Sequence, residues 1–233
     1  MRPNLARRLT AECIGTLLLL AAVVGSGVMG ERLAAGNVAL ALLANTIATG
    51  AALVALILAF GPISGAHLNP AVTLADAMRG GVGWDEVPGY IAAQMVGAFA
   101  GVAVAHLMFG LPVYSVSVHV RSGPPQLFSE FVATFGLLAV IWGCAGKRPT
   151  AVAFAVGAYI TAAYWFTAST SFANPAVTLA RSMTSTFSGI RPADVTGFIG
   201  VQFLGAIAAT ALFAWMLPVP KEAESALPEE QDR

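Results

Sequence analysis

The chain has 233 residues, of which 57% are hydrophobic and only 10% are charged. Soluble domains carry about 25% charged residues, so this composition excludes a wholly soluble protein and predicts a surface that faces lipid. The 12 basic and 12 acidic residues give a formal net charge of zero, which offers nothing to a nucleic-acid partner.

Six apolar windows of about 20 residues predict membrane-spanning helices. They cover residues 9–30, 37–60, 87–109, 127–145, 150–167 and 195–217. The basic N-terminus before the first window resembles the start of a signal peptide. The length of that window, and the glutamate at its start, instead favour a retained first helix.

Two further apolar segments, 69–78 and 174–183, are too short to span a membrane. Each begins with Asn-Pro, and asparagine is a favoured N-cap while proline suits the first helical position. We therefore expect two re-entrant half-helices. Their entering loops, at about 61–68 and 168–173, would present backbone carbonyls to a cavity, because irregular backbone at membrane depth needs such a setting.

The distribution of arginine and lysine predicts that both termini are cytoplasmic. The basic N-terminus and the basic loop 146–149 share one side of a six-span protein, and Arg79 falls on that side too. Arg181 and Arg191 fall on the opposite side as exceptions. The acidic, polar tail 218–233 is predicted to be disordered.

The two halves of the chain repeat one another. Each half contains, in order, a span with a glutamate, an Asn-Pro half-helix and a span with a glutamine. The paired features are Glu12 and Glu130, Gln94 and Gln202, and the identical segments Asn-Pro-Ala-Val-Thr-Leu-Ala at 69–75 and 174–180. Three spans per half require the halves to be inverted in the membrane, and inverted repeats with broken helices mark a permeation site.

Through its two Asn-Pro-Ala boxes and glutamate spans, the chain resembles the aquaporin and aquaglyceroporin family over about residues 5–217. The resemblance implies an all-α membrane fold of six spans and two half-helices. It implies a single channel domain at 1–217, with repeats at about 5–110 and 126–217, and a homotetramer with one pore per subunit. It further implies a passive, non-enzymatic channel in a bacterial-type inner membrane, without catalytic residues, metal or cofactor.

The pore residues implied by the resemblance are Asn69, Pro70, Ala71, Asn174, Pro175 and Ala176. Each half-helix N-terminus carries about +0.5 charge, so two facing ends would repel cations, and the asparagine amides would donate to solute oxygens. A carboxylate within a span is by default a functional hypothesis. The resemblance gives Glu12 and Glu130 the task of holding the loops; the alternative is a proton relay in a coupled transporter.

The family's narrowest point is a filter of four positions, one of which is usually an arginine three residues after the second Asn. Val177 occupies that position here. The carried-over partners are Thr49, Ser171 and either Ala162 or Tyr164, depending on whether the fifth span is counted back from Asn174 or forward from Gly157. Water-selective relatives are aromatic at the position of Thr49.

Valine lacks the five donors and the charge of arginine, so we expect a wider and less charged filter. Such a filter would admit glycerol and other polyols besides water. The resemblance is closest to bacterial arsenic-associated aquaglyceroporins, which implies undissociated arsenite and methylated arsenicals as further solutes. The alternatives are a water-selective aquaporin, a proton-coupled transporter and a structural protein with a closed pore.

Arg181 stands one helical turn beyond Val177 on the same face of the second half-helix. One interpretation places its charge in the outer vestibule, and the other lets it reach the lipid headgroups. Asp76 has the same spacing from the first Asn. We expect the backbone carbonyl of His67 to line the pore rather than its ring to act as a ligand, and His119 to be solvated.

Overall fold

The computed structural model describes residues 3–217, so the tail 218–233 lies outside the described residues. Within the described part the chain is all helical, and six helices are long and apolar enough to cross a membrane. The long helices are α1 (Leu5–Leu33), α2 (Val38–Ser64), α4 (Val87–Met108), α5 (Pro124–Ala145), α6 (Val152–Phe166) and α8 (Pro192–Met216). The half-helices are α3 (Pro70–Met78) and α7 (Pro175–Ala180). Short 3-10 helices, η1 (Pro149–Ala151) and η2 (Arg181–Met183), precede α6 and extend α7. The predicted fold class is confirmed.

Several helices extend a few residues beyond the expected windows, and in two places this changes a loop. Helix α2 continues through Pro62 to Ser64 and ends at Gly65, whose φ of 93° is the left-handed conformation that terminates helices. The first re-entrant loop is therefore only residues 65–68 rather than 61–68. Helix α5 begins at Pro124 rather than at 127, because prolines are well tolerated in a first helical turn. The outer loop between α4 and α5 therefore covers residues 109–123.

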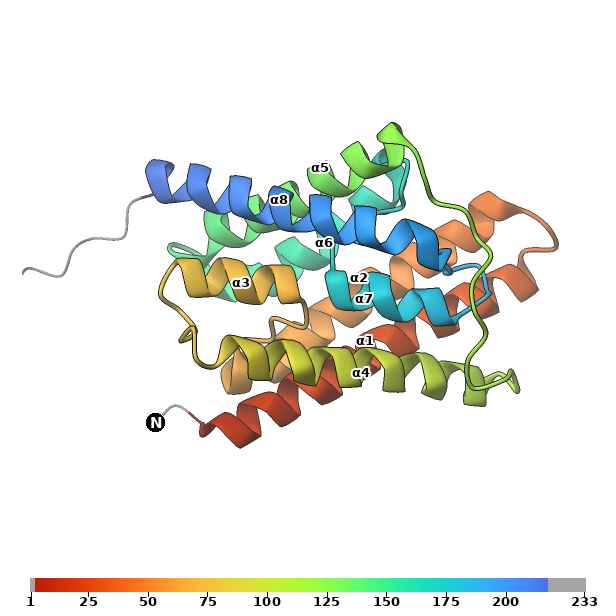
Figure 1. The fold of residues 1–233 in the computed structure, drawn as a ribbon, viewed down its shortest axis with the longest axis horizontal. Coiled ribbons are helices and arrows are strands. Elements are labelled where there is room, and N and C mark those ends of the chain that lie inside the picture. Colours follow the sequence, from red (N-terminus) through yellow and green to blue (C-terminus); the bar gives the residue numbers. More distant parts are fainter. Residues whose placement is uncertain (1–2, 218–233) are drawn as a thin grey trace, which may run out of the picture.

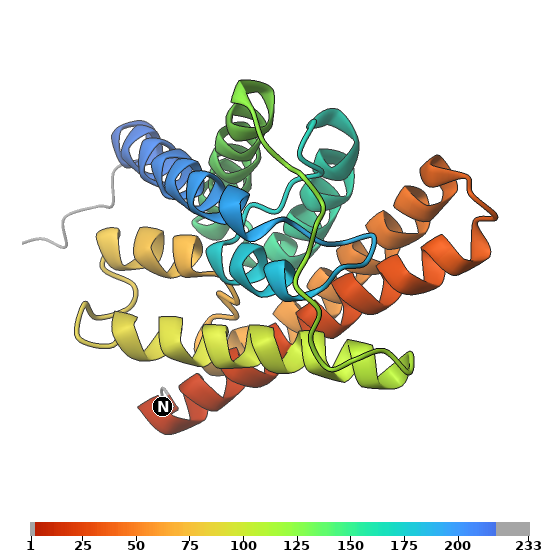
Figure 2. The same ribbon diagram turned by 45° about the vertical axis from the view of Figure 1, so that its right-hand side comes forward.

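The half-helices lie end to end along the long axis of the molecule (Figure 1). Helices α1 and α4 lie on one side of them and α5 and α8 on the other, an arrangement that the turned view also shows (Figure 2). Contacts follow the repeat: α1 packs on α2 and α4, and α5 packs on α6 and α8. Each half-helix contacts the last helix of both halves, so the centre is built jointly.

Close helix contacts repeat in both halves through one glycine each. A Cβ on Gly97 would clash with the backbone oxygen of Cys13, and a Cβ on Gly205 would clash with that of Phe131. Small residues let helix backbones approach closely where lipid offers no hydrophobic driving force between helices. These two contacts bring the glutamate span and the glutamine span of each half together.

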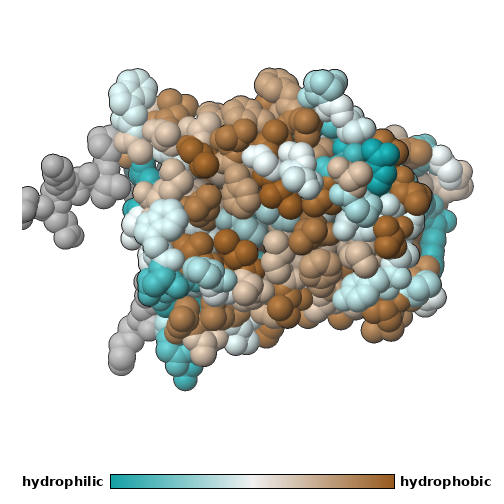
Figure 3. Space-filling model, viewed as in Figure 1, coloured by the Kyte–Doolittle hydropathy of each residue, from teal (hydrophilic) through white to brown (hydrophobic). Residues whose placement is uncertain are grey.

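Large apolar side chains cover much of the outer surface. They include Leu33, Val96 and Trp215, which are 73%, 63% and 79% exposed. Apolar residues dominate the visible face, while polar residues gather toward the ends of the long axis (Figure 3). A surface of this kind is stable against hydrocarbon and would aggregate in water.

Candidate pore and selectivity filter

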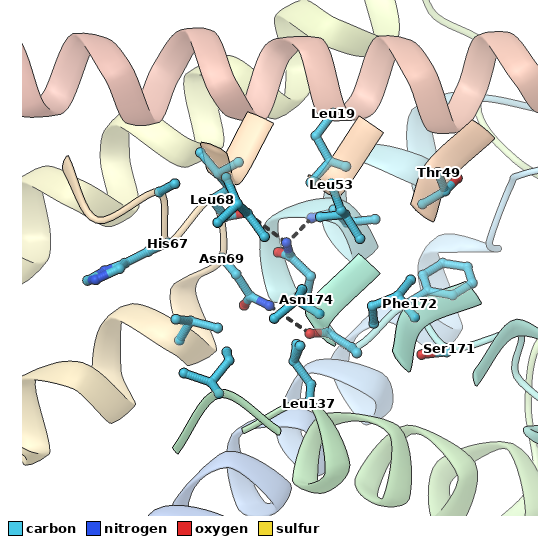
Figure 4. Close-up of a pocket in the computed structure, with 18 of the residues that line it drawn as sticks. Leu19, Thr49, Leu53, His67, Leu68, Asn69, Leu137, Ser171, Phe172 and Asn174 are labelled. Atoms are coloured by element: carbon cyan, nitrogen blue, oxygen red, sulfur yellow. Dashed lines mark hydrogen bonds between the residues drawn. The ribbon is translucent and has the colours of Figure 1, made fainter. Parts of the chain in front are cut away.

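An elongated cavity of about 280 Å³ runs between the two halves and past the start of both half-helices. His67 lies toward one end, Asn69 and Asn174 lie in the middle, and Thr49 and Ser171 lie toward the other end (Figure 4). A second cavity of about 350 Å³ shares His67 with the first, so the His67 end widens into a vestibule. We call the end with Thr49 and Ser171 the outer end, following the expected topology.

The two asparagines are crossed at the centre of the cavity. The Nδ2 of Asn69 donates to the carbonyl of Ala173 at 2.8 Å, and the Nδ2 of Asn174 donates to the carbonyl of Leu68 at 2.8 Å (Figure 4). Each Oδ1 in turn caps its own half-helix, at 2.9 Å from the N–H of Ala71 and 3.0 Å from that of Ala176. An amide has two N–H groups, so one donor of each asparagine remains for a solute.

Glu12 holds the first re-entrant loop. Its carboxylate accepts hydrogen bonds from the backbone N–H groups of His67 and Leu68, at 3.0 and 2.7 Å, and from the hydroxyl of Ser64 at 2.6 Å. The amide of Gln94 also donates to it, at 2.8 Å. Glu12 is fully buried and absent from the lining of the described cavities.

Glu130 holds the second loop in the same manner. It accepts from the N–H groups of Phe172 and Ala173 at 2.8 and 2.9 Å, and from the amide of Gln202 at 2.6 Å. The same amide donates to Thr178 of the half-helix at 2.8 Å. Gln94 likewise donates to Thr73 at 2.9 Å, so both glutamines link the glutamate that holds a loop to the half-helix that follows it.

Both loops contain non-glycine residues in the left-handed region. They are Ala66, Leu68, Thr170, Ser171 and Ala173, with φ between 47° and 61°. Each such residue costs on the order of 1–2 kcal/mol. The buried carboxylates bind the N–H groups that this conformation turns inward, so the glutamates offset the strain of the loops.

Four of the residues expected to form the filter line the cavity toward its outer end. Thr49, Tyr164, Ser171 and Val177 all line it, and each is no more than 5% exposed. The hydroxyls of Thr49 and Tyr164 are 3.3 Å apart. The buried hydroxyl of Ser171 has no hydrogen-bond partner within residues 3–217 and stays available to a solute.

Helix α6 resolves the choice at the fifth-span position. Its buried face carries Gly157, Ile160 and Tyr164, which follow the three- and four-residue spacing of one helix face. Ala162 is exposed on another face and does not line the described cavity. Of the two alternatives, Tyr164 is the one that reaches the pore.

Arg181 also lines the cavity, at only 2% exposure. Its guanidinium carbon lies 3.5 Å from the centre of the Phe172 ring, and its Nε donates to the carbonyl of Ser188. An arginine that reached the headgroups would be exposed, so that interpretation was wrong. The charge lies within the molecule, at the outer end of the cavity.

Arg121 is a contributor that the sequence reasoning missed. From the outer loop it reaches inward and donates to the carbonyls of Gly189 and Ser169, at 2.8 and 3.2 Å. Its guanidinium carbon lies 5.0 Å from the ring of Phe172. Burial lowers the pKa of Arg121, opposed by the negative charge of Glu130. No local pattern marks this residue, because a long loop carries it back over the pore mouth.

The histidines have separate surroundings. His67 lines both cavities, and its ring lies with Nε2 3.5 Å from Asp76 and Nδ1 3.2 Å from Thr73. His106 is buried and bonds to Thr184 at 2.7 Å, and His119 is exposed. In the described part of the chain no group of three His, Cys, Asp or Glu could hold a metal.

Comparisons with known proteins agree with this architecture. The sequence profile of the family described as Major intrinsic protein matches residues 1–151. Aquaglyceroporin AqpS of Rhizobium meliloti (strain 1021) is 58% identical over 92% of this chain and 91% of its own length. Aquaporin NIP2-3 of Zea mays is 31% identical over 92% of this chain and 69% of its own.

A solved structure, the aquaglyceroporin from Plasmodium falciparum, superposes with a TM-score of 0.68 at 20% identity. The superposition covers 91% of this chain and 95% of that one, and it shows a shared fold. The family match covers well over half of the chain. The chain therefore belongs to the major intrinsic protein family, and it is a multi-pass, non-enzymatic membrane channel for small solutes.

Proposed function

We propose that this channel conducts glycerol and other small uncharged polyols together with water, through a filter wider than a water filter. The observation that carries the proposal is Val177, which lines the outer end of the cavity where the family usually places arginine. Valine is shorter than arginine and adds neither charge nor hydrogen-bond donors. The 58% identical relative AqpS is named an aquaglyceroporin, and this similarity supports glycerol as a solute.

The polar groups around Val177 suit a solute with several hydroxyls. Thr49, Tyr164 and Ser171 offer hydroxyls that can both donate and accept, while Val177 presents an apolar wall. A polyol has a carbon face and a hydroxyl face. Its carbon face would pack against Val177, and its hydroxyls would bond to the hydroxyl groups opposite. Past this ring, the free N–H groups of Asn69 and Asn174 would take over the solute oxygens, and the positive half-helix ends would repel cations.

We extend the proposal to undissociated arsenite and methylated arsenicals. Undissociated arsenite is a small neutral molecule with three hydroxyls, so it presents the same hydrogen-bonding groups as glycerol. The resemblance to bacterial arsenic-associated members supports this extension. A filter built for water alone would exclude these solutes by size.

A proton-coupled transporter using Glu12 and Glu130 is the alternative from another class. Both carboxylates are fully buried behind the loops, and their oxygens accept three or more hydrogen bonds each. Neither carboxylate lines the described cavities, so neither faces the passage. These surroundings favour the loop-holding role.

The assembly and topology belong to the proposal as well. We propose one channel domain over 1–217 with two inverted repeats, a homotetramer with a pore in each subunit, and a bacterial inner membrane with both termini cytoplasmic. The start of α1, the end of α3 and the connection between α5 and α6 lie at the same end of the molecule (Figure 1). These segments contain Arg7, Arg79 and the basic loop 146–149, which supports one basic cytoplasmic face.

Stopped-flow uptake into proteoliposomes tests the function. Vesicles containing the protein should take up glycerol well above the rate of empty vesicles, without saturation and without dependence on a proton gradient. Glycerol uptake equal to that of empty vesicles, with water flux intact, would overturn the polyol proposal. Saturable, gradient-dependent uptake would instead establish the coupled transporter. Arsenite uptake in the same vesicles tests the extension.

A further inference from the structure

The outer end of the pore contains an arginine, but not at the family's filter position. Val177 and Arg181 are four residues apart and both line the cavity. One helical turn corresponds to about 5.4 Å along the axis, so the charge lies roughly that far beyond the ring formed with Thr49, Tyr164 and Ser171. The ring is therefore widened at Val177, while the positive charge of Arg181 lies one turn further out.

The guanidinium of Arg181 is fixed in place. One face packs on Phe172 and the Nε donates to the carbonyl of Ser188. No hydrogen bond from its terminal nitrogens is found among residues 3–217, although the side chain is only 2% exposed and lines the cavity. The terminal nitrogens are not among the fully buried unpaired polar atoms of residues 3–217, so they are accessible from the cavity that Arg181 lines and can bind a solute there.

The charge of Arg181 is not neutralised by a nearby acid in the pore wall. Asp76 is the one acidic residue in the lining of the described cavity, and it lies at the opposite end beside His67. Glu130 lies behind the loop and is occupied by backbone N–H groups and Gln202. The second arginine near Phe172, Arg121, adds positive charge at the same end.

We propose that Arg181 is the selectivity cation of this pore, moved one helical turn outward. It repels cations before they reach the widened ring, and its terminal nitrogens bind hydroxyl oxygens of entering uncharged polyols. This inference rests on the proposed function, because a hydroxyl-binding entrance has a purpose only if polyols permeate. It explains how a filter without an arginine remains closed to ions.

The test measures K⁺ efflux, glycerol uptake and water flux in the same proteoliposomes, with a protonophore to compensate charge. Wild-type vesicles should hold K⁺ as well as empty ones. Arg181→Gln should raise K⁺ efflux by about tenfold. The positive charge of Arg181 repels K⁺ strongly, because little solvent screens the two charges inside the narrow cavity. Water flux in the variant shows that the channel has assembled.

Two further variants separate charge from structure. Arg181→Lys keeps the charge but loses the planar fork, so K⁺ should stay excluded while glycerol uptake falls about threefold. The double variant V177R/R181Q returns the charge to the ring, so it should exclude K⁺ again and lose glycerol flux. Arg191→Gln is the matched control, since Arg191 is half-exposed, pairs with Asp194 and does not line the cavity.

The inference is overturned if water-conducting Arg181→Gln channels retain K⁺ like the wild type. It is equally overturned if Arg181→Lys leaks K⁺, because that would make the side chain's shape, rather than its charge, responsible. If the Arg181→Gln channel fails to assemble, K⁺ efflux through Arg181→Lys still tests whether the charge at position 181 excludes cations. Failure of the proposed function is a separate result, namely absent glycerol uptake in the wild-type channel.

Discussion

The two re-entrant segments share seven identical residues and are held by the same kinds of hydrogen bond, yet the two ends of the pore that they form have opposite charge. In each half a buried glutamate holds the loop and an asparagine caps the half-helix. The residue after the heptad differs, and it is Asp76 in the first half and Arg181 in the second. Both line the cavity, so the repeat places an acid at one end and a base at the other.

The loops differ in their external support. The second loop is covered by the outer loop, whose Arg121 donates to the carbonyl of Ser169 and lies over Phe172. At the first loop, His67 contacts Thr73 and Asp76 of its own half. The repeated residues therefore build the backbone of the pore, while the residues that are not repeated distinguish its two ends.

The largest expected effect comes from removing a loop anchor. Glu130→Ala leaves two buried backbone N–H groups without their acceptor and removes one of the two acceptors of the Gln202 amide. The variant should lower the free energy of unfolding by about 3 kcal/mol or more. Glu12→Ala should have an effect of at least similar size, because Glu12 accepts the same three kinds of hydrogen bond and a fourth from Ser64. Thermal unfolding in detergent measures both.

Glu31→Ala serves as the matched control for both anchors. This glutamate is exposed at the end of α1 and should leave the melting temperature unchanged. Anchor variants as stable as the control would show that the loops hold their shape without the carboxylates. A large effect at only one glutamate would break the equivalence of the halves.

A smaller effect is expected from the support that only the second half has. Arg121→Gln removes hydrogen bonds to Gly189 and Ser169 and the contact with Phe172. The second re-entrant loop, which contains Ser171, should therefore become more mobile. We expect glycerol uptake to change about three- to tenfold while water flux changes less. Arg32→Gln, an exposed arginine at the same end, is the comparison variant. If both variants take up glycerol at the same rate, Arg121 does not support the loop that contains Ser171.

The smallest expected effect distinguishes the two candidates on α6. Tyr164→Phe deletes the hydroxyl 3.3 Å from that of Thr49 and should lower the ratio of glycerol to water flux a few-fold. Ala162→Val should leave the ratio unchanged, because Ala162 is exposed outside the cavity. Flux ratios from the same vesicle preparation measure both. A change in the Ala162 variant alone would reverse the assignment.

Much of the fold could be predicted because its signals are local. Apolar windows of spanning length marked the six long helices, and Asn-Pro marked the start of both half-helices. The helix end at Ser64 was missed, since an apolar window does not show that helix continues through Pro62 until Gly65 ends it.

The filter was only partly predictable. Thr49, Ser171 and Val177 followed from counting within motifs, and they line the cavity. The choice between Ala162 and Tyr164 depended on which face of α6 is buried, and a nearly uniformly apolar helix does not reveal this. Arg121 depended on the path of a long loop, which local sequence does not determine.

The central claim is that Val177 makes the filter wide, and Val177→Arg tests it most directly. Wild-type and variant proteoliposomes would be compared in the ratio of glycerol to water permeability. We predict a fall of at least about tenfold in that ratio, with part of the water flux retained, because arginine adds bulk and charge at the ring. An unchanged ratio in an assembled variant would contradict the account, since position 177 would then not control passage.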